Sequence, residues 1–100
     1  MFDRNLNMTA AFFACKLRLN KEDIENIFLD DDKIKVKEVR IIHRFRLPSD
    51  EIETTAVVQF EDKNSLRLAI SRYDGMEYDF KEKGIHELFL NPDAVTCLVQ

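Results

Sequence analysis

Basic side chains concentrate in one short segment of an otherwise acidic chain. Between Lys33 and Arg46 there are six lysines or arginines and a single acid, Glu38. The whole sequence has 15 lysines and arginines against 19 aspartates and glutamates, which gives a formal net charge of −4. A molecule of this charge repels polyanions overall, so nucleic-acid binding would have to come from a local basic patch. The alternative is that these side chains only protect an edge strand from aggregation.

Residue types that catalyse reactions or hold metals are few and scattered. His43 and His86 have no second histidine or cysteine at a metal-ligand spacing. Cys15 lies in an apolar run, where a thiol is inert unless its pKa is lowered. With only two glycines, Gly75 and Gly84, a glycine-rich phosphate-binding loop is excluded. We therefore expect no enzymatic activity, no metal, no cofactor and no small-molecule substrate.

Cysteine usage and hydropathy indicate where such a chain would reside. Cys15 and Cys97 lie near opposite ends of the sequence and form no CxxC pair. This favours two reduced thiols over a disulfide, and hence an intracellular protein, nuclear or cytoplasmic. The sequence has no apolar run of the roughly 18 residues that a membrane span needs, so we expect no membrane partner.

Hydrophobic periodicity predicts one domain over residues 9–92, between an N-terminal arm at 1–8 and a C-terminal extension at 93–100. A length of 100 residues suits a single domain. The predicted elements are a strand over 9–19, a helix from 21 to about 29 capped by Asn20, a strand over 34–45, a strand over 54–60, a helix that begins after Asp62 or Asn64 and ends at Asp74 and Gly75, and a strand over 85–90.

This order of elements is the split βαβ pattern of an α+β, ferredoxin-like βαββαβ domain. Such a domain has a four-stranded antiparallel sheet with two helices packed on one face. The apolar positions predict a shared core of Ala56, Val58, Phe60, Ile24, Phe28, Leu66, Ile70, Val39 and Ile41. The other face of the sheet is left open, and its side chains are the candidates for function.

The sequence from Ala56 to Tyr78 resembles the RNA recognition motif (RRM) family. In this stretch the strand residues Ala56, Val58 and Phe60 precede a helix with Leu68, Ala69 and Ile70, and then the turn Asp74, Gly75, Met76, Glu77, Tyr78. Core-type residues also occur in the second strand at Val36, Val39 and Ile41, so the resemblance covers nearly all of residues 10–92. It implies the fold described above and an RNA-binding sheet face.

The octapeptide with which RRM domains bind RNA is half present, at residues 53–60. The core residues Ala56, Val58 and Phe60 are kept, but Thr55 and Val57 replace the two aromatics that stack on bases. On the first strand, the alternation of side chains between the two faces puts Phe12 in the exposed stacking position. One aromatic of the binding platform is therefore expected to remain.

Two functions follow from the residues assigned to the open face. The first is a non-catalytic module that binds single-stranded RNA weakly, in a ribonucleoprotein or RNA-processing context, through Phe12, Lys16, Arg18, Arg40 and Arg44. The second is a protein–protein interaction module that uses the RRM fold without base stacking, through the apolar patch Ile42, Thr55, Val57 and Phe89.

Overall fold

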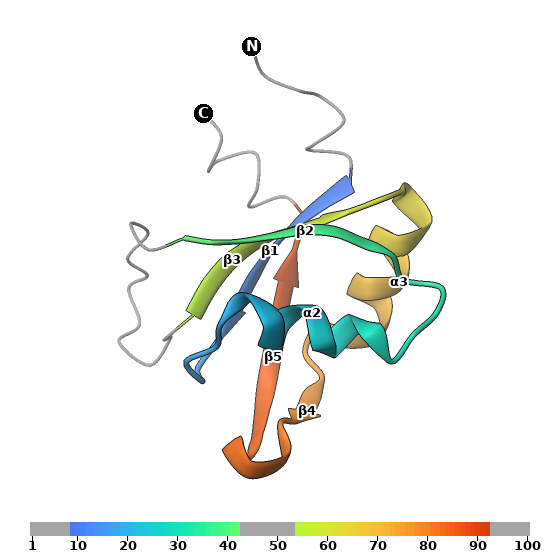
Figure 1. Ribbon diagram of the computed structural model, residues 1–100. Helices are drawn as coiled ribbons and strands as arrows, with labels where there is room; N and C mark the ends of the chain where they lie inside the picture. The colour runs from blue at the N-terminus through green and yellow to red at the C-terminus, as the bar shows by residue number, and fades with distance from the viewer. Residues whose placement is uncertain (1–8, 43–53, 93–100) are drawn as a thin grey trace.

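The computed structural model describes residues 9–42 and 54–92, which form an α+β fold (Figure 1). With the labels of Figure 1, the elements are β1 (Ala10–Cys15), α2 (Lys21–Leu29), β2 (Val36–Ile41), β3 (Thr54–Phe60), α3 (Lys63–Tyr73), β4 (Glu77–Asp79), the 3-10 helix η1 (Lys81–Lys83) and β5 (Ile85–Asn91). The five strands pair antiparallel in the order β2-β3-β1-β5-β4. The predicted arm at 1–8, the C-terminal extension at 93–100, and the predicted site residue Arg44 lie outside the described residues.

Alternation along the strands places one face of the sheet against both helices. The apolar residues of this face and of the two helices form one buried cluster, which includes Ala11, Phe13 and Cys15 of β1, Ala56, Val58 and Phe60 of β3, Leu88 and Leu90 of β5, Ile24, Ile27 and Phe28 of α2, and Leu66, Ala69 and Tyr73 of α3. At its centre the Phe28 ring packs edge-to-face on Phe60 and on Tyr73, with ring centroids 5.6 and 5.2 Å apart. Figure 1 shows α2 in front of the strands.

α2 begins directly after the predicted cap Asn20, and α3 begins directly after Asp62, one of the two caps predicted for it. The Asn20 side chain accepts a hydrogen bond from the Asp23 N–H, and the Asp23 carboxylate accepts one from the Asn20 N–H, which completes a capping box. Asp62 caps α3 by accepting the Ser65 N–H at 2.7 Å, and this bond lowers the pKa of its carboxyl. Side chains that pair the free N–H groups of the first turn fix where each helix starts.

Two buried hydroxyl groups tie loops to the core. Thr54 Oγ1 accepts a hydrogen bond from the Leu19 N–H at 2.7 Å and donates one to the Leu17 carbonyl at 2.9 Å. Ser65 Oγ, fully buried at the start of α3, accepts the Lys35 N–H at 2.9 Å just before β2. Each hydroxyl satisfies backbone groups that no neighbouring strand reaches.

The sheet has five strands, so the expectation of four is wrong. The additional strand, β4, pairs with β5 at the sheet edge, in a stretch expected to be a polar connection. Its three residues, Glu77, Tyr78 and Asp79, include two acids and are too few to show an alternating pattern. Gly75, with φ of +79°, ends α3 ahead of it, and the Gly75 N–H donates to the Leu88 carbonyl at 2.8 Å.

Several strand boundaries and two core residues also differ from expectation. β1 ends at Cys15 rather than Leu19, because the backbone at Leu17 and Leu19 bonds to the Thr54 side chain instead of a strand. β2 spans Val36–Ile41 rather than 34–45, and its pairing with β3 has an irregularity between Val36 and Glu38. Ile41 and Ile70, both predicted as core residues, are half-buried and pack against the core cluster without belonging to it. None of the helices in the described ranges has the length and apolar character to cross a membrane.

Candidate functional site

The face of the sheet opposite the helices, which we call the open face, carries most of the predicted site residues. Its side chains follow from strand alternation and pairing: Ala10, Phe12 and Ala14 of β1; Glu38 and Arg40 of β2, followed by Ile42; Thr55, Val57 and Gln59 of β3; Glu77 and Asp79 of β4; and Ile85, Glu87, Phe89 and Asn91 of β5.

Strand pairing arranges the middle of the open face in two rows. The first row runs Arg40, Val57, Phe12 and Asn91 across β2, β3, β1 and β5. The second runs Ile42, Thr55, Ala14 and Phe89, since the Ile42 N–H donates to the Thr55 carbonyl at 2.9 Å. The larger apolar side chains of these rows are Ile42, Val57, Phe12 and Phe89, which we call the apolar stripe.

The side chains of the apolar stripe are more exposed to solvent than the smaller residues between them. Ala14 and Thr55 are buried, whereas Phe12, Val57 and Ile42 are half-buried and Phe89 is 37% exposed. The stripe is therefore a run of partly exposed apolar side chains. It includes Ile42, directly after β2, and one residue on each of the neighbouring strands β3, β1 and β5.

Charged side chains lie at both ends of the open face. On β2 the Arg40 guanidinium lies 3.6 Å from the Glu38 carboxylate, with both side chains more than half exposed. At the opposite edge Glu77 and Glu87 are paired directly across β4 and β5, and both are exposed. The charge of the arginine is thus partly balanced at its end, while the other end is acidic.

The structure brings together only part of the residue set predicted for RNA. Phe12 and Arg40 share the open face and the first row. Lys16 and Arg18 are exposed in the loop after β1, so strand alternation does not assign them to a face. Arg44 lies outside the described residues.

The residue set predicted for a protein partner lies together on the open face. Ile42, Thr55 and Phe89 share the second row, and Val57 is in the first. Thr55 is buried, and its hydroxyl donates a hydrogen bond to the Ile42 carbonyl at 2.9 Å. This bond holds the backbone of Ile42, a stripe residue, against β3.

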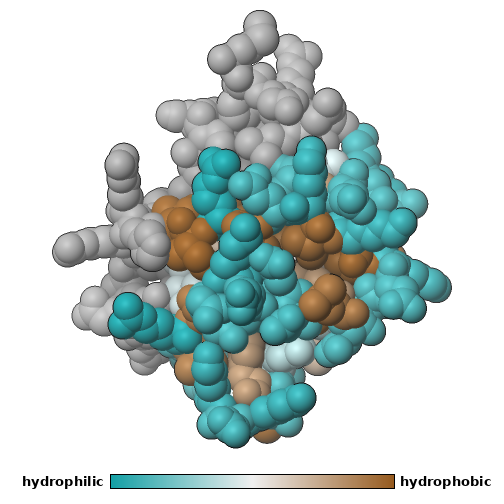
Figure 2. All heavy atoms as spheres, viewed as in Figure 1, coloured by the Kyte–Doolittle hydropathy of each residue, from teal (hydrophilic) through white to brown (hydrophobic). Residues whose placement is uncertain are grey.

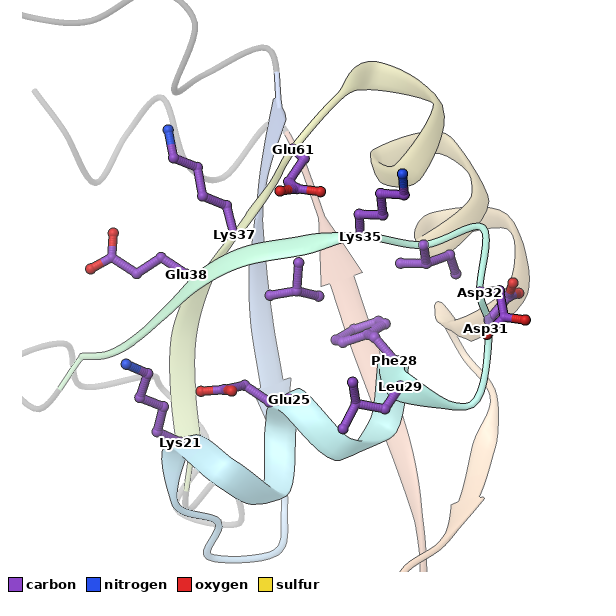
Figure 3. A pocket seen from close by; sticks show the side chains of 12 residues that line it. Lys21, Glu25, Phe28, Leu29, Asp31, Asp32, Lys35, Lys37, Glu38 and Glu61 are labelled. Atoms are coloured by element: carbon purple, nitrogen blue, oxygen red, sulfur yellow. The ribbon is translucent and has the colours of Figure 1, made fainter.

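The helix-bearing side of the molecule offers a groove of mixed charge. Figure 2 shows this side as largely hydrophilic with separate apolar patches. Between α2 and β2 lies a hollow of about 470 Å³, with Lys21, Glu25 and Leu29 on α2 and Lys37 and Glu38 on β2 (Figure 3). Because acids and bases alternate around it, the groove presents no single charge to a ligand.

The described residues include one thiol, at Cys15. Burial raises the pKa of the Cys15 thiol, which disfavours the nucleophilic thiolate. Within 9–42 and 54–92, histidine, cysteine and acidic side chains form no group of three or more that could hold a metal ion.

Sequence reasoning missed two features of the open face. Ile85 is 63% exposed on β5, on the same face as Phe89 and separated from it by Glu87, and Glu77 lies opposite Glu87. The alternation of β5 is a signal that could have found Ile85 and Glu87. The pairing of Glu77 depends on β4, whose three residues carry no such pattern.

The whole sequence was compared with known families and with curated proteins. No family model matches it, and no curated protein matches it.

Proposed function

We propose that this chain is a non-catalytic interaction module of ferredoxin-like, RRM-related fold whose open face binds a segment of a protein partner. The observation that carries the proposal is the apolar stripe, which joins Ile42, directly after β2, to Val57, Phe12 and Phe89 on the neighbouring strands β3, β1 and β5. The fold part is supported by the order β2-β3-β1-β5, with β4 added beside β5, and by the packing of α2 and α3 on one face. The buried, free Cys15 supports an intracellular location.

A protein partner gains free energy from this face mainly by covering apolar surface. Burial of apolar area contributes roughly 25 cal/mol per Å², and a few well-placed aromatic side chains usually dominate an interface. Phe89 and Val57 hold part of their side chains in solvent, so a partner that covers them removes that surface from water. The gently twisted surface of a sheet also gives an extended peptide segment a broad area to contact.

The charges of the open face favour a peptide over a polyanion. Arg40 already has Glu38 within 3.6 Å, and Glu77 and Glu87 repel phosphate at the β4–β5 edge. Thr55 and Val57 stand where the resemblance would place base-stacking aromatics. Apolar contact is therefore the main interaction that the described part of this face offers.

The proposal predicts that a charge placed in the stripe abolishes peptide binding. Random dodecapeptides displayed on phage are selected on the immobilised wild-type chain, and the enriched peptides are synthesised. We expect Val57→Glu and Phe89→Glu each to weaken their binding by at least about tenfold, because a buried carboxylate is left unpaired. Fluorescence anisotropy of labelled peptides measures the affinity.

The matched control is Leu29→Glu. Leu29 is 71% exposed on α2 and lies on the helix-bearing side, so this variant adds the same charge away from the stripe. Circular dichroism confirms that each variant is folded, and Phe89→Glu, at the more exposed position, keeps the test informative if Val57→Glu unfolds. Peptides that bind Phe89→Glu and wild type equally, or a selection that enriches none, would contradict the proposal.

Single-stranded RNA is the second candidate, favoured by the two aromatics of the stripe. Phe12 on β1 and Phe89 on β5 are diagonal neighbours, since Ala14 is the residue opposite Phe89. Each stacked base contributes about 1 to 3 kcal/mol on such platforms. Weak binding of a mixed-sequence RNA would then fall with salt at a slope near −0.7 per phosphate contacted, and Arg40→Ala would remove about one contact. No fluorescence response to the RNA at low salt would exclude this candidate.

A further inference from the structure

The geometry at the β4–β5 edge points to a basic partner: we infer that the bound segment places an arginine or lysine over Glu77 and Glu87, between apolar residues that contact Ile85 and Phe89. This inference rests on the proposed function, because it names the chemistry of the segment that the open face binds. It starts from two carboxylates that the sheet holds opposite each other.

Glu77 and Glu87 form a cross-strand pair of like charge. They are directly opposite in the antiparallel register of β4 and β5, where side chains of one face lie about 5 Å apart at Cβ. Both are exposed, and neither makes an ion pair with any residue in the described ranges. Like charges in this arrangement destabilise a sheet, and a cation between them removes the repulsion.

Apolar residues flank the acidic pair along β5. Ile85 is 63% exposed and Phe89 is 37% exposed, and both point to the same face as Glu87. Since a strand rises about 3.3 Å per residue, the row Ile85, Glu87, Phe89 repeats at roughly 6.6 Å. An extended peptide has the same repeat on each of its faces, so an apolar, basic, apolar sequence at alternate positions matches this row.

The acidic pair continues directly into the apolar stripe. Phe89 belongs both to the β5 row and to the stripe, so a segment that runs along β5 over Glu87 meets the stripe at Phe89. An arginine suits the pair better than a lysine, because its planar guanidinium presents several N–H donors to two carboxylates at once.

The test compares peptides and chain variants of matched charge. The peptides are those enriched in the phage selection whose binding requires Phe89. We expect them to carry an arginine or lysine between apolar residues at alternate positions, and to lose at least about tenfold in affinity for the double variant Glu77→Gln, Glu87→Gln. The control is Glu22→Gln, Glu25→Gln on α2, which changes the net charge equally and should leave affinity unchanged.

The outcomes separate this inference from the proposed function. If the peptides require Phe89 but bind the Glu77→Gln, Glu87→Gln variant as tightly as wild type, the basic partner is overturned and the proposed function stands. If the α2 control weakens binding equally, the effect is one of net charge alone, and the inference is again overturned. If the selected peptides do not require Phe89, both fail.

Discussion

Replacing Phe60 with alanine is expected to lower the free energy of unfolding by about 3 to 5 kcal/mol. The Phe60 side chain is 1% exposed, and its ring contacts Phe28 edge-to-face. Alanine removes the transfer free energy of the ring and leaves a cavity that a close-packed interior fills only partly. Guanidinium unfolding followed by circular dichroism measures the change.

The control for Phe60→Ala is Leu29→Ala. Leu29 is the last residue of α2 and is 71% exposed, so its truncation should change stability by no more than about 0.5 kcal/mol. If Phe60→Ala were as mild as this control, Phe60 would not face the core. Phe60 and Val57 are an odd number of positions apart in β3, so their side chains point to opposite faces of the sheet. If Phe60 did not face the core, Val57 would not lie on the open face.

Replacing Thr54 with valine is expected to cost about 1 to 3 kcal/mol, although the two side chains have nearly the same shape. Thr54 is 4% exposed, and its hydroxyl accepts the Leu19 N–H and donates to the Leu17 carbonyl. Valine leaves that N–H without an acceptor inside the protein. Chemical denaturation gives the loss of stability, and amide hydrogen exchange at Leu19 should become faster.

Thr55→Val is the matched control for this substitution. Thr55 is also buried in β3, but its hydroxyl donates to the Ile42 carbonyl rather than accepting from an N–H group. Valine at this position therefore leaves no backbone N–H without an acceptor. We expect a smaller loss than for Thr54→Val. Equal losses, with unchanged exchange at Leu19, would show that the Thr54 hydroxyl does not hold the loop after β1.

The elements that sequence predicts best are those whose signals are local and uninterrupted. The alternation in β3 predicts the same range, 54–60, that the structure has, because Ala56, Val58 and Phe60 place an apolar side chain on the core face at every second position. Asn20 predicts the start of α2, since a cap bonds within three residues of itself. For α3 the sequence offers Asp62 or Asn64, and the structure has Asp62 as the cap.

The remaining features depend on bonds between distant residues. The apolar alternation of β1 continues through Leu17 and Leu19, but pairing stops at Cys15, where a hydroxyl more than 30 positions away binds the backbone. No local pattern contains that information. Likewise, alternation assigns Phe12 and Val57 to the open face, whereas the opposition of Glu77 and Glu87 needs the partner strand.

The central position of β1 has a consequence for the order in which the chain can fold during synthesis. β1 is synthesised before the other described strands, and it pairs on one side with β3 and on the other with β5, the last strand described. Until residues 85–91 have been translated, one edge of β1 has no partner in the sheet. The apolar strand Ala10–Cys15 then exposes unpaired backbone groups, as aggregation-prone edges do. Nascent chains that stop before β5 should therefore need chaperones more than the finished protein does.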